Sequence, residues 1–94
     1  MSNNSKDIIF IGKKPLMTYV TSAIIQLATM PSITIKARGM TIAYAVDVAQ
    51  IVLQKTKPAF VISNITIGSE SLVSQDGRNR DVSSIEISLK RTET

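Results

Sequence analysis

The chain lacks cysteine and histidine altogether. Without cysteine there is no disulfide, no thiolate metal site and no cysteine nucleophile. Without histidine there is neither the usual general base nor the commonest zinc ligand. We therefore predict a protein that is not an enzyme and that uses no cofactor or metal. The carboxylates show no close pairing with a base or nucleophile and no metal-ligand spacing; they are Asp47, Glu70, Asp76, Asp81 and Glu86. A metal-dependent nuclease using Asp76 and Asp81 is the enzymatic alternative.

Long apolar runs are also missing. The longest, Ile42 to Val46, is too short to cross a bilayer or to form the core of a signal peptide, and Met1 to Asp7 are polar. We expect a soluble, cytoplasmic protein with no membrane partner. The 94 residues suffice for one hydrophobic core. Residues 1–6 are predicted to be disordered, and residues 7–94 to form a single domain.

Positive charge is in excess. Eleven Lys and Arg against seven Asp and Glu give a net charge of +4, and the sequence pI is about 9.7. Such a balance favours polyanionic partners, because cations that contact phosphates release bound counterions. A hydrophobic fraction of 44% is that of an ordinary globular protein.

The apolar periodicity predicts the element order βαβαββ. Ile8 to Ile11 read as a strand buried on both faces, and Pro15 suits the first turn of the following helix. The remaining elements are a helix from about Lys14 to Thr29, a strand over 33–38, a helix from Thr41 to about Lys55, and strands over 60–73 and 84–90. This order implies an α/β (α+β) two-layer sandwich: a mixed four-stranded sheet with two helices on one face. Right-handed crossovers make the first two strands parallel neighbours, and the last two form an antiparallel pair.

The last two strands carry two irregular features. The alternating apolar residues fall on even-numbered positions at Phe60 and Ile62 and on odd-numbered positions at Ile65 and Ile67. This change predicts a bulge near Ser63 and Asn64. The polar stretch from Ser74 to Asp81 contains the turn signal Asp76-Gly77 and predicts a long hairpin tip.

Three groups of cations are candidate contacts for nucleic acid. Lys13 and Lys14 stand at a strand-to-helix turn, where backbone N–H groups are free. Lys36 and Arg38 share the polar side of the second strand, whose end should lie beside that turn, and no carboxylate is expected among these four cations. Arg78 and Arg80 lie in the hairpin tip, which suits entry into a narrow minor groove. Each group also fits an ordinary solvated surface, and Asp76 and Asp81 partly cancel the arginines.

Several short motifs resemble, in order, those of the archaeal Alba family. They are Ile11–Pro15, Lys36–Gly39, Ala45–Asp47, Ile67–Ser69, Ser74–Arg78 and Ser84–Ile87. The resemblance spans Ile8 to Leu89. It implies a fold similar to the C-terminal domain of bacterial translation initiation factor three, in agreement with the element order.

The resemblance also implies a function. The expected protein is a homodimer, or a heterodimer with a paralogue, that binds double-stranded DNA and RNA without sequence preference and packages the chromosome. Lys13 and Lys14 would contact phosphates, Lys36 and Arg38 would be contacts of the body, and Arg78 a contact of the hairpin arm, with Arg80 beside it. Lys13 also matches a lysine that is an acetylation target in the family. An RNA-binding assembly subunit of a ribonucleoprotein particle is the alternative.

The chain departs from the family pattern at a few positions. Met40 and Tyr44 stand where many relatives carry basic residues, and Asp81 stands where a basic residue is common. Relatives that coat DNA cooperatively often carry a phenylalanine at the contact between dimers, near the end of the second helix. This chain has Thr56 in that region, and threonine buries less apolar area. These departures predict a less basic body and weaker packing between dimers.

Overall fold

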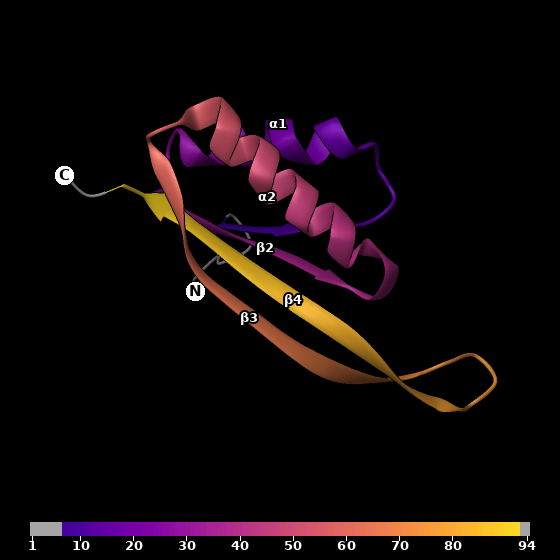
Figure 1. Cartoon of the computed structure of the whole chain (residues 1–94). Coiled ribbons are helices and arrows are strands. Elements are labelled where there is room, and N and C mark those ends of the chain that lie inside the picture. Colours follow the sequence, from indigo (N-terminus) through magenta and orange to yellow (C-terminus); the bar gives the residue numbers. More distant parts are fainter. Residues whose placement is uncertain (1–6, 93–94) are drawn as a thin grey trace.

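The computed structural model describes residues 7–92 and has the predicted two-layer architecture (Figure 1). Its elements are β1 (Ile8–Phe10), α1 (Leu16–Leu27), β2 (Ser32–Arg38), the 3-10 turn η2 (Gly39–Thr41), α2 (Ile42–Thr56), β3 (Phe60–Val73) and β4 (Asn79–Arg91). The four strands form one sheet in the order β1-β2-β4-β3, with β1 parallel to β2 and the other pairs antiparallel. Both helices cover the same face, so the predicted fold class is confirmed. The segment 1–6, expected to be disordered, lies outside the described residues.

The core lies between the helices and the central strands. Ile33, Ile35 and Ala37 of β2 stand opposite Leu89, Ile87 and Ile85 of β4, and all six are buried. Because paired residues point to the same side of a sheet, this register turns a continuous apolar layer toward the helices. The helices add buried side chains at helical spacing, namely Val20, Ala23 and Leu27 from α1 and Ala45, Val48, Ala49 and Val52 from α2. Burying each larger aliphatic side chain stabilises the fold by about 1.5–3 kcal/mol.

No helix of the described part of the chain lies on the opposite face of the sheet. Thr34, Lys36 and Arg38 of β2 alternate with the core residues and point to this helix-free face. Phe10 of β1 is 67% exposed, whereas its neighbour Ile9 is buried. The prediction that Ile8–Ile11 is buried on both faces was therefore wrong, because among residues 7–92 no second layer covers that side of the sheet.

The ends of the helices differ slightly from the predicted ones. Helix α1 begins at Leu16, so Pro15 precedes its first turn rather than lying inside it, and its carbonyl accepts from Thr18 N at 3.0 Å. Helix α2 begins at Ile42, after the turn made by Gly39 with a φ of 63°. Neither described helix has the length and apolar character that crossing a membrane would require.

Strand β3 is an edge strand with the predicted bulge. The register with β4 shifts between Ile62 and Asn64, which leaves Ser63 as the extra residue. Beyond the bulge, Ile65 and Ile67 stand opposite the buried Ile87 and Ile85, yet they are 53% and 77% exposed. They face the helix side of the sheet at a place that the helices do not reach, as the position of β3 in Figure 1 shows.

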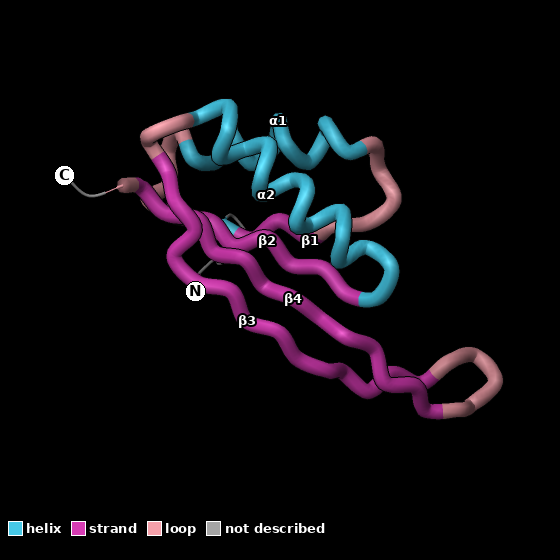
Figure 2. The backbone as a smooth tube through the Cα atoms, in the orientation of Figure 1, coloured by secondary structure: helices cyan, strands magenta, loops and turns pink. Residues whose placement is uncertain are grey.

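The two long strands continue beyond the rest of the sheet as an arm (Figure 2). The pairing of β2 with β4 ends at Arg38 and Ser84, whereas β3 and β4 remain paired as far as Val73 and Asn79. Residues 69–83 thus form a projecting two-stranded ribbon, and the molecule measures 50 × 31 × 19 Å. The closing loop is shorter than the predicted tip, because pairing resumes at Asn79, ahead of Asp81.

Candidate functional site

The loop of residues 12–15 joins β1 to α1 at the end of the sheet where β2 also ends. Ile11 N–H donates to the Lys36 carbonyl at 2.9 Å, which places the start of this loop beside the last residues of β2. Lys13 and Lys14 are exposed, and within residues 7–92 they form no ion pair. The arm projects from the same end of the molecule (Figure 1). We call this region, defined by Lys13, Lys14, Lys36 and Arg38, the basic end.

A buried tyrosine holds the loop in shape. The Tyr19 hydroxyl accepts from the backbone N–H of Gly12 at 2.8 Å and from that of Lys14 at 3.0 Å. Tyr19 is 7% exposed, and its ring belongs to the core. The prediction that the backbone N–H groups of this turn are free was wrong for Gly12 and Lys14, because the Tyr19 hydroxyl accepts from both and so fixes the backbone around Lys13.

Both helices direct their N-termini toward the basic end (Figure 1). Neither has an acidic residue in its first turn or a capping side chain. The helix dipole places partial positive charge at both N-termini. Two helix N-termini therefore add their partial positive charge to that of the lysines at this end.

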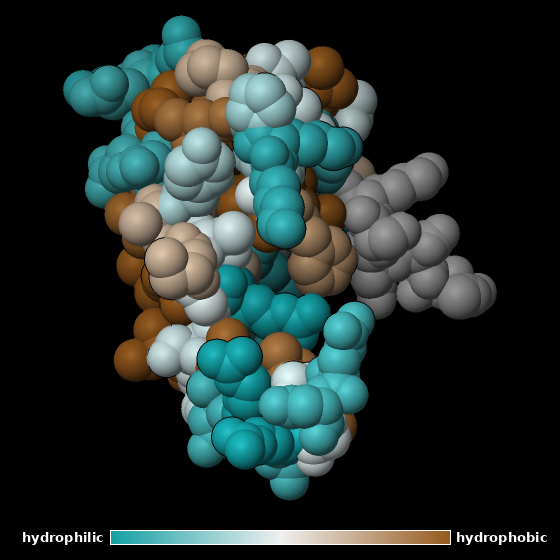
Figure 3. Space-filling view, turned by 90° about the vertical axis from the view of Figure 1, so that its right-hand side faces the viewer, coloured by the Kyte–Doolittle hydropathy of each residue, from teal (hydrophilic) through white to brown (hydrophobic). Residues whose placement is uncertain are grey.

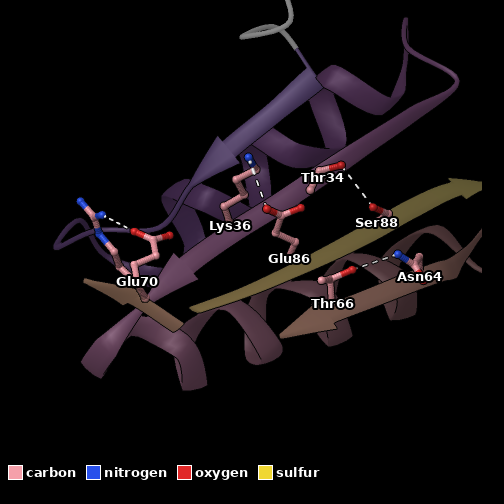
Figure 4. A network of polar contacts seen from close by, with 8 residues as sticks. Thr34, Lys36, Asn64, Thr66, Glu70, Glu86 and Ser88 are labelled. Carbon is pink, nitrogen blue, oxygen red and sulfur yellow. Dashed lines mark hydrogen bonds and ion pairs between the residues drawn. The ribbon is translucent and has the colours of Figure 1, made fainter. Parts of the chain in front are cut away.

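Lys36 and Arg38 are paired with carboxylates. Lys36 Nζ lies 3.5 Å from Glu86 Oε2, and Arg38 Nη1 donates to Glu70 Oε1 at 2.8 Å. All four side chains are partly exposed on the helix-free face, as Figure 4 shows for Lys36, Glu86 and Glu70. The expectation that no carboxylate lies among these cations was therefore wrong, because β4 and β3 bring in acidic residues that are distant in the sequence.

The arm tip is ordered by its own polar groups. Gly77, with a φ of 84°, closes a turn in which its N–H donates to Ser74 O at 2.9 Å, and Ser74 N–H donates to Arg78 O at 2.9 Å. The Asp76 carboxylate accepts from the Ser74 hydroxyl and from Arg78 N–H, and these bonds hold the pKa of Asp76 below its ordinary value of 3.8.

The two arginines of the tip differ in their surroundings. Arg78 Nε lies 3.8 Å from Asp76 Oδ2, whereas Arg80 has no ion pair within residues 7–92. Asp76 and Asp81 balance Arg78 and Arg80, so the tip has no net charge. Figure 3 looks along the molecule from this side and shows hydrophilic residues over the arm at the bottom and across the middle of the body.

Nothing in residues 7–92 favours metal chemistry. Among these residues no three His, Cys, Asp or Glu side chains are gathered to hold an ion. Asp47 is exposed on α2.

Sequence reasoning missed Glu70, Glu86 and Phe10 as neighbours of the basic end. Strand alternation did place Glu86 on the polar side of its strand. The sequence could not show that Glu86 pairs with Lys36, because that contact depends on the register of β2 with β4. Alternation within one strand does not determine this register.

Comparison with known proteins gives consistent matches. Residues 7–69 match the family model described as Alba. The chain is 63% identical over 94 residues to the DNA/RNA-binding protein Alba of Nitrosopumilus maritimus (strain SCM1), covering 99% of each chain. It is 44% identical over 86 residues to the protein of the same description from Methanocella arvoryzae, covering 90% of each.

Two solved structures are similar as well. Alba from Thermoplasma volcanium superposes with a TM-score of 0.83 at 46% identity, covering 89% of this chain and 99% of that one. ALBA1 from Trypanosoma brucei, at 20% identity, shares the fold, with a TM-score of 0.75 over 94% of this chain and 71% of that one.

Replacing Tyr19 by phenylalanine tests its role in the loop. Tyr19→Phe leaves the N–H groups of Gly12 and Lys14 without their acceptor, and we expect it to lower the free energy of unfolding by about 1–3 kcal/mol. Amide hydrogen exchange should accelerate at residues 12 and 14. Tyr44→Phe is the matched control, because the Tyr44 hydroxyl has no hydrogen bond within residues 7–92. Equal effects of the two substitutions would contradict this role.

Acid titration tests the arm tip. Because the folded pKa of Asp76 is lowered, its stabilisation of the turn is present above its unfolded pKa and is lost as the pH falls through the lowered value. Carboxyl NMR should place the midpoint of Asp76 below 3.8, and Ser74→Ala should raise it by removing the main donor. A midpoint of 3.8 or higher in the unaltered protein would show that the turn does not hold the carboxylate.

Proposed function

The chain belongs to the Alba family, and on that premise we propose that it binds double-stranded DNA and RNA without sequence preference, as a cytoplasmic, chromosome-associated packaging protein. The resemblance seen in the sequence motifs is confirmed by the family match and by the identity to relatives described as DNA/RNA-binding proteins. This is a family of nucleic-acid-binding proteins and not of enzymes.

The observation that carries the proposal is the pair Lys13 and Lys14. Both ammonium groups are exposed without an acidic partner in residues 7–92, and they lie beside two uncapped helix N-termini. This arrangement favours phosphate oxygens, which accept from lysine and are attracted by the positive ends of the helix dipoles. Such contacts read no sequence, and their strength depends on salt.

The other cations make weaker contributions in this proposal. To contact a phosphate, Lys36 and Arg38 must leave their ion pairs with Glu86 and Glu70, or contact the phosphate and the carboxylate together. Exposed ion pairs are worth about 0–1 kcal/mol, so this exchange is accessible to a polyanion. Arg78 and Arg80 act from the arm, where shape and hydrogen bonding guide entry into a minor groove because the tip has no net charge.

A second subunit would double this surface. Ile65 and Ile67 form an exposed apolar strip on the edge strand β3, and Tyr44 and Val46 of α2 are exposed large apolar residues as well. Exposed apolar strips on an edge strand mark association surfaces. We place the second subunit of a homodimer, or of a heterodimer with a paralogue, on this strip.

Acetylation of Lys13 would weaken the interaction. The modification removes one of the two unpaired charges of the loop and leaves Tyr19 and the backbone around it unchanged. The expected effect is a lower affinity with an intact fold.

Neutralising the loop lysines tests the proposed function. We expect Lys13→Gln with Lys14→Gln to lower the affinity for a DNA duplex and to reduce the slope of log K against log salt by about 2, close to 0.9 per phosphate contact. Lys55→Gln with Lys57→Gln is the control: it removes the same charge at the far end of α2, about 22 Å along the helix. Fluorescence anisotropy over a salt series measures both. Equal slopes for the two variants, or affinity that does not depend on salt, would refute phosphate binding by this loop.

Charge placed on the β3 strip tests the dimer. Ile65→Lys with Ile67→Lys should give monomers in sedimentation equilibrium at concentrations where the unaltered protein is dimeric, because two buried charges would be costly. Met17→Lys with Ile25→Lys, on the exposed side of α1, should leave the dimer intact. A monomeric unaltered protein, or a dimeric β3 variant, would rule out this surface.

A further inference from the structure

The helix-free face of the sheet carries an exposed aromatic side chain next to the basic end. Phe10 is 67% exposed, although an aromatic ring gains more than most side chains from burial. It stands on β1 directly beside Lys36, its register partner on β2. Phe10 also lines a hollow on this face with Lys36, Arg38, Glu70, Ser84 and Glu86.

The hollow suits a neutral planar group better than a phosphate. Its two cations are each matched by a carboxylate, Lys36 by Glu86 and Arg38 by Glu70. A phosphate entering here would face both carboxylates, whereas Lys13 and Lys14 nearby offer charge without that repulsion. A nucleobase carries no charge and presents both donors and acceptors on its edge.

The groups around the ring match what a base requires. Lys36 Nζ lies 5.9 Å from the centroid of the Phe10 ring, within the range of a cation–π contact that fixes one face of the ring. The carboxylate of Glu86, 3.5 Å from that ammonium, can accept from an exocyclic amino group. Unpaired bases commonly stack on aromatic side chains of an open sheet face.

We propose that Phe10, with Lys36 and Glu86, forms a stacking site for an unpaired base of an RNA strand whose phosphates are held by Lys13 and Lys14. The proposal rests on the proposed function and adds to it a site for single-stranded or bulged RNA. Phe10 and Lys13 are three residues apart in the chain, a span of at most about 10 Å. One strand can therefore reach both.

A tryptophan at position 10 reports on stacking directly. The chain contains no tryptophan, so Phe10→Trp introduces a single tryptophan, whose emission can be excited and recorded apart from that of the two tyrosines. We expect oligoadenylate to quench its emission. A blunt RNA duplex of equal phosphate number should bind without quenching it, because its bases are already stacked.

Affinity measurements separate stacking from charge. Phe10→Ala should weaken binding of oligoadenylate by about tenfold and leave binding of the duplex unchanged, whereas Phe10→Trp should retain both. Ile25→Ala removes a similarly exposed apolar side chain, 64% exposed on α1, and should change neither. The stacking site would be overturned if Phe10→Ala weakened binding of both oligoadenylate and the duplex, or of neither. Quenching of the tryptophan emission by the duplex in Phe10→Trp would overturn it as well. Failure of the unaltered protein to bind either probe would instead overturn the proposed function.

Discussion

The pairing of β2 with β4 determines which side chains of these two central strands face the core and which form the polar face. Ile35 opposite Ile87 turns the apolar side chains of both strands toward the helices. The same register turns Lys36 and Glu86 to the other face and brings them within ion-pair distance. A slip of one residue would exchange the two faces and bury the charges under the helices, which the desolvation cost forbids. The register that buries the core residues of β2 and β4 therefore also determines which polar residues lie side by side on the other face.

The charge of the chain is divided between two kinds of cation. Lys13 and Lys14 stand free of carboxylates in residues 7–92, while Lys36 and Arg38 are compensated by their neighbours. The electrostatic potential is therefore more positive at the loop of residues 12–15, and less positive on the helix-free face, than an even distribution of the net charge of +4 would give. This division permits one end of the molecule to attract phosphates and the adjoining face to accept an uncharged group.

The sequence predicted the architecture because its signals are local. Helical spacing, strand alternation and the parity slip near Ser63 are all visible within a few residues, and each corresponds to an element of the structure. The errors concern tertiary relations. Phe10 looked like a core residue because its strand is uniformly apolar, but no other layer formed by residues 7–92 covers it. Glu70 is 32 residues from Arg38, and no local pattern connects them.

The phosphate contacts at Lys13 and Lys14 lie close to the stacking site at Phe10, and this proximity strengthens the effect of a single stacked base. A strand held at Lys13 and Lys14 keeps its next nucleotides close to Phe10, so stacking becomes an intramolecular step with a high effective concentration. A single stacked base, worth about 1–3 kcal/mol, would bind very weakly alone. Attached to the phosphate contacts, it suffices to distinguish a strand with an unpaired base from a perfect duplex. Selectivity for structured RNA then requires no reading of sequence, only a free base within reach of the ring.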